Sequence, residues 1–524
     1  MKETANPEDE DECELEIEDV KDYSPSYRLK RSFNSDVDKR KRTIIKQTTP
    51  TAVRYGLSNT AHCALIASTV AAAGSEDDFS SISSTKRLRS REINRLATDI
   101  KNSFLEDFAG YPKLLQWDGK IMEVTSSKET NKEDVNAVVL SVPGSSLPPK
   151  AVGAPNLSQG TGIALAQSSL EAIREFTAIE DLIGGVFDTT SANTGLKEGA
   201  MCHLERLTDT KLLWLPCRHH ISELHIKHAY TKVMMPSNSP EDPLFKAFKE
   251  WFVQQRDAVP GFPEPGTFRT YDWGVSDTGY SIGPCRKEEH WFMRQTLDWL
   301  QEHLLKDTFP RADYREMCEL INFILGGDYV ATSKRKTSFT LKKPGACHHA
   351  RFMAKAIYLL KIYILSLIFN RLTPRQMSDL ERMVLFIICL YGKYFLQSSL
   401  AVAAPRLDYE FQLQMRMYES IDPQLSDCVL KSVYRHLWYL TPELIVLSLF
   451  DPQITLIEKE TMAKKLSNIS VPDNFERGKP SFDFLNENLC NVTSLSELIN
   501  ENSWFLFEKS KEYLNAVGIP SSMG

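Results

Sequence analysis

The sequence predicts an α/β fold in which a mixed five-stranded sheet with flanking helices is interrupted by a large all-α insertion. Three short strand patterns joined by polar links occupy residues 114–157, which is typical of an antiparallel meander. Two further apolar strands, 182–187 and 212–216, alternate with helical patterns, and residues 240–430 give helical patterns alone. Strands that first follow one another and then alternate with helices favour a mixed sheet covered by helices.

Each predicted element has its own signal. The first strand, 114–122, surrounds Trp117 and Asp118, and the second, 135–142, is rich in Val and Leu and ends at a Pro-Gly turn. The third strand covers 150–157. Apolar residues at helical spacing predict helices over 92–108, 160–178, 194–207 and 217–230. These helices lie before the sheet, between its last strands and directly after its fifth strand.

The pattern predicts five segments along the chain. Residues 1–92 are expected to form a mostly disordered arm, because its acidic run over 8–19 and its basic clusters over 39–42 and 86–91 repel themselves. Residues 93–235 would form the first part of the core, 236–430 the helical insertion, 431–455 the final core helices and 456–524 a C-terminal helical tail. The basic clusters are solvated faces, phosphate contacts or nuclear-localisation signals.

Composition narrows the class of protein. The formal net charge is −7 over 524 residues, so any DNA contact must depend on local basic patches rather than on bulk charge. Ten cysteines are scattered without the dense spacing of a disulfide scaffold, and the N-terminus has no apolar run of a signal peptide. Lys355 and Lys361 interrupt the most apolar stretch, 353–369, which predicts a buried helix rather than a membrane span. We therefore expect an intracellular, nuclear protein with no membrane partner.

Two aspartates are the first candidates for chemistry. Asp118 lies inside the first strand, where a carboxylate is costly unless it is paired or bound to a metal. Asp188 follows the fourth strand, where it could meet a ligand or simply cap the next helix. If the two strands are neighbours, the carboxylates repel each other unless a cation lies between them. A hard divalent ion such as Mg²⁺ or Mn²⁺ suits oxygen ligands of this kind.

A second candidate follows the fifth strand, in the run Cys217-Arg218-His219-His220. Cys217 and His220 are three residues apart at a helix start and so share one face. They could be half of a zinc site, although a structural zinc ion needs two more ligands. A role in the core or at the surface is the alternative.

In order and spacing, these motifs resemble the catalytic core of hAT-superfamily transposases over residues 110–450. The matching segments are Trp117-Asp118-Gly119, the run that begins Phe187-Asp188-Thr189-Thr190, and Cys217-Arg218-His219-His220. The resemblance implies a ribonuclease-H-like core with Asp118, Asp188 and a later helical glutamate as metal ligands. Cys217, Arg218 and His220 would be structural or contact DNA.

Glu443 is the candidate for the third acid, with Glu410 and Glu419 as rivals. It follows Thr441 and Pro442, so ordinary helix-start chemistry also explains it. With all three acids, two Mg²⁺ or Mn²⁺ ions would support DNA cleavage and strand transfer. The resemblance also implies homo-oligomers. An N-terminal zinc finger is not recognisable. This favours the alternative of a domesticated, catalytically inactive DNA- or protein-binding protein that keeps the fold. An unrelated helical scaffold is the third hypothesis.

Overall fold

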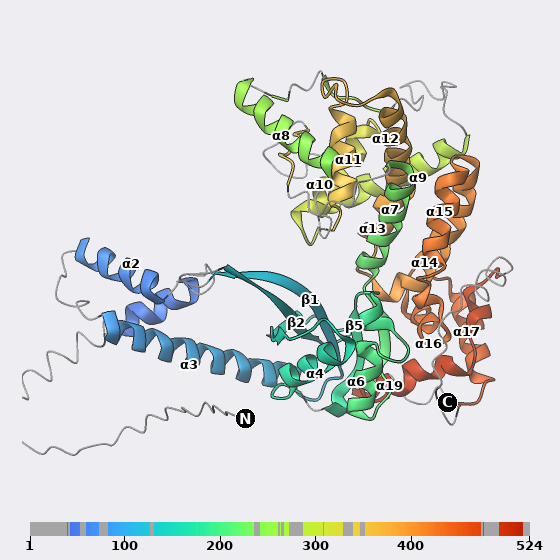
Figure 1. The fold of residues 1–524 in the computed structure, drawn as a ribbon. Coiled ribbons are helices and arrows are strands. Elements are labelled where there is room, and N and C mark those ends of the chain that lie inside the picture. The colour runs from blue at the N-terminus through green and yellow to red at the C-terminus, as the bar shows by residue number, and fades with distance from the viewer. Residues whose placement is uncertain are drawn as a thin grey trace, which may run out of the picture. The chain divides into compact units, whose positions relative to one another are not determined.

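The chain divides into two units, Met1–Ala109 and Gly110–Gly524, which are described separately below. The computed structural model describes residues 39, 42–52, 59–72, 82–125, 130–177, 179–234, 242–259, 262–263, 267–271, 287–307, 309–327, 339–345, 352–472, 475 and 492–516 (Figure 1). The acidic run over 8–19 lies outside these residues.

The described part of the first unit is helical. A helix over 42–52 precedes α2 (Asn59–Ala72) and α3 (Ile82–Phe108). Ile45 and Ile66 form a small core against Leu88 and two further apolar side chains, Ile44 and Ala67. The sequence predicted a mostly disordered arm over 1–92 and a helix only from 92. That helix instead begins at Ile82. The residues before 92 are mostly Ser and basic residues, and Leu88 is their contact with the small core, so the sequence shows no apolar helical spacing there.

The second unit begins with a six-stranded mixed sheet. Its strands are β1 (Lys113–Thr125), β2 (Thr130–Ser141), β3 (Lys150–Gly153), β4 (Asn156–Leu157), β5 (Leu182–Phe187) and β6 (Leu213–Pro216). The order is β3-β2-β1-β5-β6, with β4 paired to β2. Strands β1, β2 and β3 pair antiparallel, whereas β5 and β6 add parallel beside β1. The predicted mixed α/β sheet is therefore confirmed.

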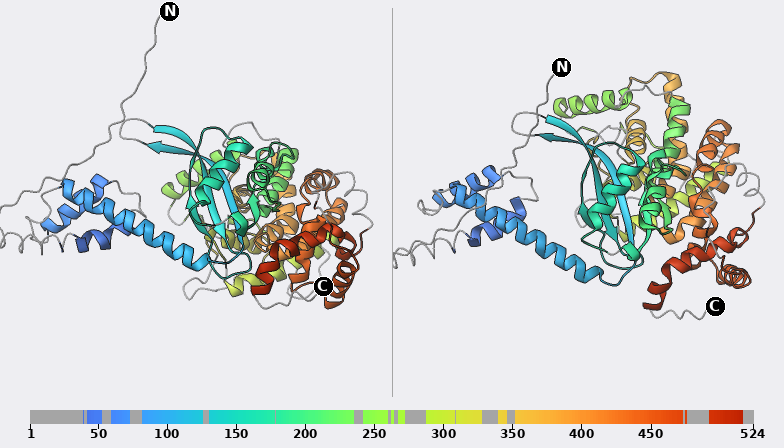
Figure 2. Two further views of the ribbon diagram at one scale, coloured as in Figure 1. Left: turned by 90° about the horizontal axis from the view of Figure 1, so that it is seen from below. Right: turned by 60° about the horizontal axis from the view of Figure 1, so that its bottom comes forward.

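One predicted strand is in fact two. Residues 150–157 form β3 and β4, which are separated at Ala154 and Pro155. Proline has no N–H to donate to a ladder, so its position interrupts the strand. The Pro155 carbonyl still accepts a hydrogen bond from the Asn136 N–H at 2.9 Å, which holds the segment between β3 and β4 against β2. The hairpin of β1 and β2 extends past the last pairing of β1 with β5 (Figure 2).

Helices α4 (Gly162–Ile173) and α6 (Ala200–Thr208) pack against each other, and α4 also packs on β1 and β2; the short η1 (Ile179–Asp181) leads into β5. A single helix was predicted over 194–207, but α5 (Ser191–Thr194) and α6 are separate. Between them the backbone turns so tightly that a Cβ on Gly199 would lie 2.5 Å from the Gly195 backbone. Glu205 of α6 accepts hydrogen bonds from the Leu212 N–H and the Trp214 indole, which fixes α6 to β6.

Every described element after β6 is a helix, as predicted for the insertion. The α-helices are α7 (Arg218–Met234), α8 (Pro243–Ala258), α9 (Lys287–Lys306), α10 (Ala312–Ile324), α11 (Ala354–Ile364), α12 (Pro374–Phe386), α13 (Gly392–Leu396), α14 (Ala404–Met417), α15 (Pro423–Val433), α16 (Pro442–Ile445), α17 (Leu456–Ser467) and α19 (Trp504–Ala516). Short 3₁₀ helices are η4 (Ala401–Ala403), η5 (Tyr418–Ser420), η6 (Trp438–Leu440), η7 (Val446–Phe450), η8 (Leu495–Leu498) and η9 (Glu501–Ser503), and η3 (Ile387–Tyr391) is a π-helix.

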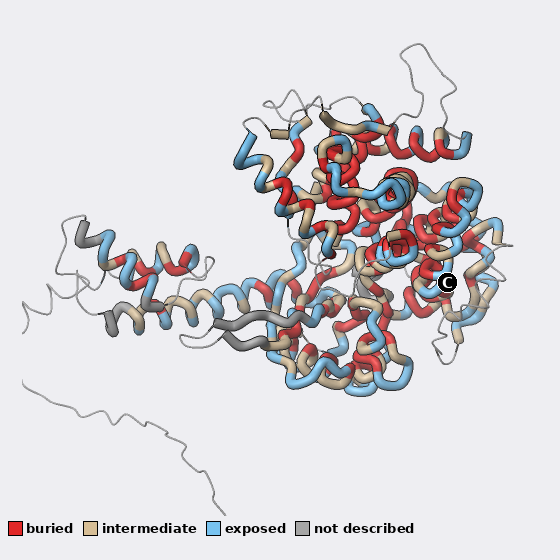
Figure 3. Tube along the Cα trace, turned by 45° about the horizontal axis from the view of Figure 1, so that its top comes forward, coloured by how far each residue is buried: buried red, intermediate tan, exposed pale blue. Residues whose placement is uncertain are grey.

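Helix α11 confirms the prediction of a buried helix in the most apolar stretch. All of its residues are buried, and Figure 3 shows the buried positions gathered inside the helical part. Its two lysines lie within ion-pair distance of acids: Lys361 Nζ is 2.6 Å from Glu316, and Lys355 Nζ is 4.0 Å from Glu223. No helix in the described part of the chain has the length and apolar character needed to cross a membrane.

Candidate active site

The parallel strands bring three of the predicted site residues into one row. Gln116 of β1 pairs with Val186 of β5, and Val186 pairs with Leu215 of β6. Asp188 directly follows β5 and Cys217 directly follows β6, so continuing this register by two residues aligns them with Asp118. Adjacent strands lie about 4.8 Å apart, so the two carboxylates are neighbours.

The two aspartate side chains belong to one face of the sheet. Trp117 and Phe187, one residue earlier, stack at 5.5 Å on the face that α6 covers. A Cβ on Gly185, on that same face, would lie 2.6 Å from the Met201 sulfur of α6. Because side chains alternate along a strand, Asp118 and Asp188 project to the opposite face. Asp118 is exposed and Asp188 is half-buried, so solvent reaches both.

Asp188 is held in place by the polar turn that follows β5. Its Oδ1 accepts hydrogen bonds from the Thr190 N–H at 3.0 Å, the Thr190 hydroxyl at 2.6 Å and the Asn193 amide at 2.7 Å. The Asn193 oxygen in turn accepts a hydrogen bond from the Trp117 indole at 2.9 Å, so Asn193 joins β1 to the turn after β5. This network orients one oxygen of Asp188 in the turn ahead of α5. The N-cap of α5 is Thr190, so Asp188 lies beside the helix start without capping it.

Cys217 and His220 lie beside the two aspartates. Burial raises the pKa of the Cys217 thiol, the backbone N–H groups of the following helical turn oppose this rise, and both carboxylates add to it. Burial lowers the pKa of His220, although Asp188 and Asp118 act in the opposite direction. The thiol is therefore protonated and the imidazole neutral at pH 7. A structural zinc ion would need two more ligands beside Cys217 and His220, and no group of three or more His, Cys, Asp and Glu side chains placed to hold a metal ion is found among the described residues.

Arg218 has a structural position. Its guanidinium donates a 2.7 Å hydrogen bond to Asp408 of α14 and a 3.3 Å bond to the Gln397 carbonyl, and both members of the ion pair are almost fully buried. The Tyr394 hydroxyl also donates to Asp408 at 2.8 Å, and the guanidinium lies over the Tyr394 ring at 5.3 Å. Arg218 thus links the start of α7 to α13 and α14, and its side chain is buried.

Glu443 occupies the first turn of α16 and is 5% exposed. Helix α16 packs against η6, η8, η9 and α19. The preceding η6 contacts β6, where the Tyr439 hydroxyl donates to the Pro216 carbonyl at 3.0 Å. The rivals for the third acid lie elsewhere: Glu410 forms an ion pair with Arg406, and Glu419 is exposed in η5.

The chemistry of these donors fits a hard divalent cation. Two solvent-accessible carboxylates lie in register, and every hydrogen bond that Asp188 accepts within the described residues goes to Oδ1, which leaves Oδ2 for a ligand. Mg²⁺ is commonly bound through one or two carboxylates plus substrate phosphates. Among the residues that the structure describes, no group of three or more His, Cys, Asp and Glu side chains is placed to hold a metal ion. A divalent cation at the two aspartates would therefore need further ligands, such as substrate phosphates.

Sequence reasoning missed the residues that support the site. Asn193 follows Asp188 by five residues and falls on the first turn after β5, a spacing that could have identified it. Asp408 and Tyr394 gave no signal, since their contacts with Arg218 span the insertion. No protein-family model matches the sequence, and a search of curated proteins also gives no match.

Proposed function

We propose that the protein acts on DNA through a divalent cation held by Asp118 and Asp188, in the manner of a ribonuclease-H-like transposase core. The observation that carries the proposal is the parallel register of β1, β5 and β6, which brings Asp118, Asp188 and Cys217 side by side at the carboxyl ends of β5 and β6. The element order supports it further: three antiparallel strands, two parallel strands alternating with helices, and a long helical insertion are what the resemblance to hAT transposases implies.

The expected role of each residue follows from its contacts. Asp118 and Asp188 would hold Mg²⁺ or Mn²⁺, and Asn193 would keep Asp188 oriented. The cation would supply charge neutralisation for a phosphodiester, whose oxygens complete its shell. The neutral His220 lies close enough to both carboxylates to feel their charge and could accept a hydrogen bond or a proton at this edge. Glu443 stays a prediction for the third acid.

Nicking of supercoiled plasmid DNA in Mn²⁺ tests the proposal. The wild-type protein should convert supercoiled to open-circular DNA, and Asp188→Asn should abolish this conversion because it removes a charged ligand. Asp427→Asn is the matched control, since Asp427 is an exposed acid of α15 paired with Lys431. Nicking by Asp188→Asn at the wild-type rate would refute a catalytic role for this site.

A second candidate function is DNA binding without cleavage. It is favoured by the finding that no three-member group of metal-ligating side chains is assembled within the described residues. In that case the wild-type protein binds duplex DNA but leaves the plasmid supercoiled in Mg²⁺ and in Mn²⁺. The two candidates are thus separated by one pair of assays, binding and nicking, on the same preparation. We propose nuclear localisation and homo-oligomer formation for the protein under either candidate function.

A further inference from the structure

Half of the residues that line a hollow in the first unit are basic. It lies between the helix over 42–52 and α3, and has a volume of about 320 Å³. Four of its eight lining residues are cations: Arg42, Lys46, Arg91 and Arg95. All four are exposed, whereas Ile45 is buried and Leu88 half-buried in the contact between the two helices. Folding of this unit therefore brings together positive charges from segments that are about 45 residues apart in the chain.

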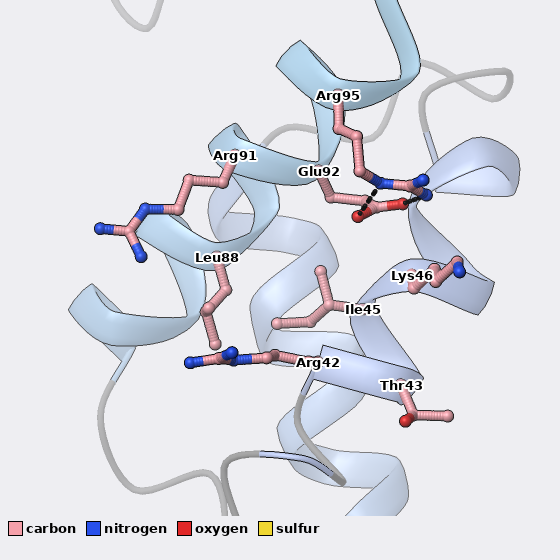
Figure 4. A pocket seen from close by; sticks show the side chains of 8 residues that line it. All are labelled: Arg42, Thr43, Ile45, Lys46, Leu88, Arg91, Glu92 and Arg95. Atoms are coloured by element: carbon pink, nitrogen blue, oxygen red, sulfur yellow. Dashed lines mark hydrogen bonds and ion pairs between the residues drawn. The ribbon is translucent and has the colours of Figure 1, made fainter. Parts of the chain in front are cut away.

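Within this hollow one acid compensates part of the charge. Glu92 accepts two hydrogen bonds from Arg95, at 2.6 and 3.1 Å. Arg95 and then Lys46 lower the pKa of Glu92, so these three form one partly neutralised group. Figure 4 shows Arg42 and Arg91 extending to the other side, past Leu88. Among the described residues, neither arginine forms an ion pair or a side-chain hydrogen bond, so the pair Arg42 and Arg91 carries the free charge of the hollow.

Charge is segregated along the described helices of this unit. These residues hold nine lysines and arginines and four acids, whereas the acidic run over 8–19 belongs to the same unit but lies outside the described residues. In α3 the first half, 82–95, has five cations and one acid, whereas 96–108 has one cation and three acids. Clustered like charges repel and cost stability unless an anion meets them. The helices need no such clustering to fold, since their core is the apolar contact around Ile45.

We propose that this hollow is a phosphate-binding site that contacts the DNA backbone through Arg42 and Arg91, separate from the Asp118–Asp188 pair. Liquid water takes about 30 Å³ per molecule, so the hollow has room for a phosphodiester group and several waters. Exposed arginines suit this task because each presents several fixed N–H donors to phosphate oxygens. The contact is with the backbone, so binding is expected to be insensitive to base sequence. The choice of DNA among polyanions rests on the proposed function.

Fluorescence anisotropy of a labelled DNA duplex with the full-length protein tests this site. EDTA is present throughout, so that no divalent cation can hold DNA at Asp118 and Asp188. The variant is Arg42→Gln with Arg91→Gln. Its control is Arg256→Gln with Arg375→Gln, which removes the same charge from exposed positions on α8 and α12. Circular dichroism verifies that both variants keep the wild-type helix content.

The test variant should bind DNA about fiftyfold or more weakly at 0.1 M salt, since counterion release contributes roughly tenfold for each phosphate contact. The slope of log affinity against log salt should also fall by about 2, because two phosphate contacts are lost. The control variant should stay close to wild type in both respects.

Equal losses in the two variants would overturn the proposal, because binding would then follow net charge. So would an unchanged salt slope in the Arg42 and Arg91 variant. Displacement of the DNA by polyglutamate more readily than by unlabelled duplex of equal charge would also overturn it, and would assign the hollow to an acidic protein segment. Because EDTA removes metal chemistry, absence of nicking in the plasmid assay leaves this result unaffected.

Discussion

The buried ion pair between Arg218 and Asp408 fixes the beginning of α7, directly after Cys217, and its removal should be strongly destabilising. Both side chains are almost fully buried and their atoms are 2.7 Å apart. Replacement of Asp408 by alanine would leave the Arg218 guanidinium without its counter-charge among the rings of Tyr394 and Tyr439. Breaking a buried pair by removing one partner costs about 3–5 kcal/mol. We expect Asp408→Ala to lower the free energy of unfolding by this amount.

Urea unfolding followed by tryptophan fluorescence measures the loss, provided that the m-value is unchanged. Asp427→Ala is the matched control, because it breaks an exposed ion pair with Lys431 and should cost less than about 1 kcal/mol. Arg218→Met with Asp408→Leu removes both charges together and should be less damaging than Asp408→Ala alone. A loss below about 1 kcal/mol for Asp408→Ala would refute the inference that this pair holds α7 in place.

Three further predictions concern the surroundings of the site. Burial lowers the pKa of His219 to about 4, so as the pH falls the unfolded state takes up a proton before the folded state does. The free energy of unfolding should therefore fall by about 3 kcal/mol between pH 6.5 and pH 4. His219→Gln should remove this pH dependence from urea-unfolding measurements. Gly185→Ala would place a methyl group 2.6 Å from the Met201 sulfur and should lower the thermal midpoint, whereas an unchanged midpoint would show that α6 can move aside. Asn193→Ala should weaken Mn²⁺ binding about tenfold in a calorimetric titration, because Asp188 loses its orienting amide; equal affinity would remove Asn193 from the site.

The sheet could be predicted from the sequence because its strands are apolar and bounded by turn residues. Residues 182–187 form β5 at the predicted bounds, and β6 begins one residue later than predicted. The division of residues 150–157 could have been anticipated from Pro155. The break between α5 and α6 was harder to see, because the apolar spacing continues past Gly195 and Gly199, and the tight backbone contact between these glycines decides it.

The candidate site could be predicted only in part. Asp118 and Asp188 are recognisable because each lies in or directly after an apolar strand, and their alignment follows from strand order. The partners of Arg218 are not recognisable, because Asp408 and Tyr394 are more than 170 residues away and are brought near by the packing of the insertion. The helix over 42–52, α2 and the part of α3 before residue 92 were missed for a related reason. Their core is small, and charged residues dominate the sequence around it.

Calorimetric titration with Mn²⁺ measures whether Asp118 and Asp188 hold a divalent cation. We expect the wild-type protein and Asp427→Asn to bind Mn²⁺ with equal affinity, and Asp188→Asn and Asp118→Asn each to weaken binding by about a hundredfold or more. Glu443→Gln, run alongside, weakens binding equally if Glu443 is a ligand. Equal Mn²⁺ affinity in wild type, Asp118→Asn and Asp188→Asn would show that the two aspartates hold no cation.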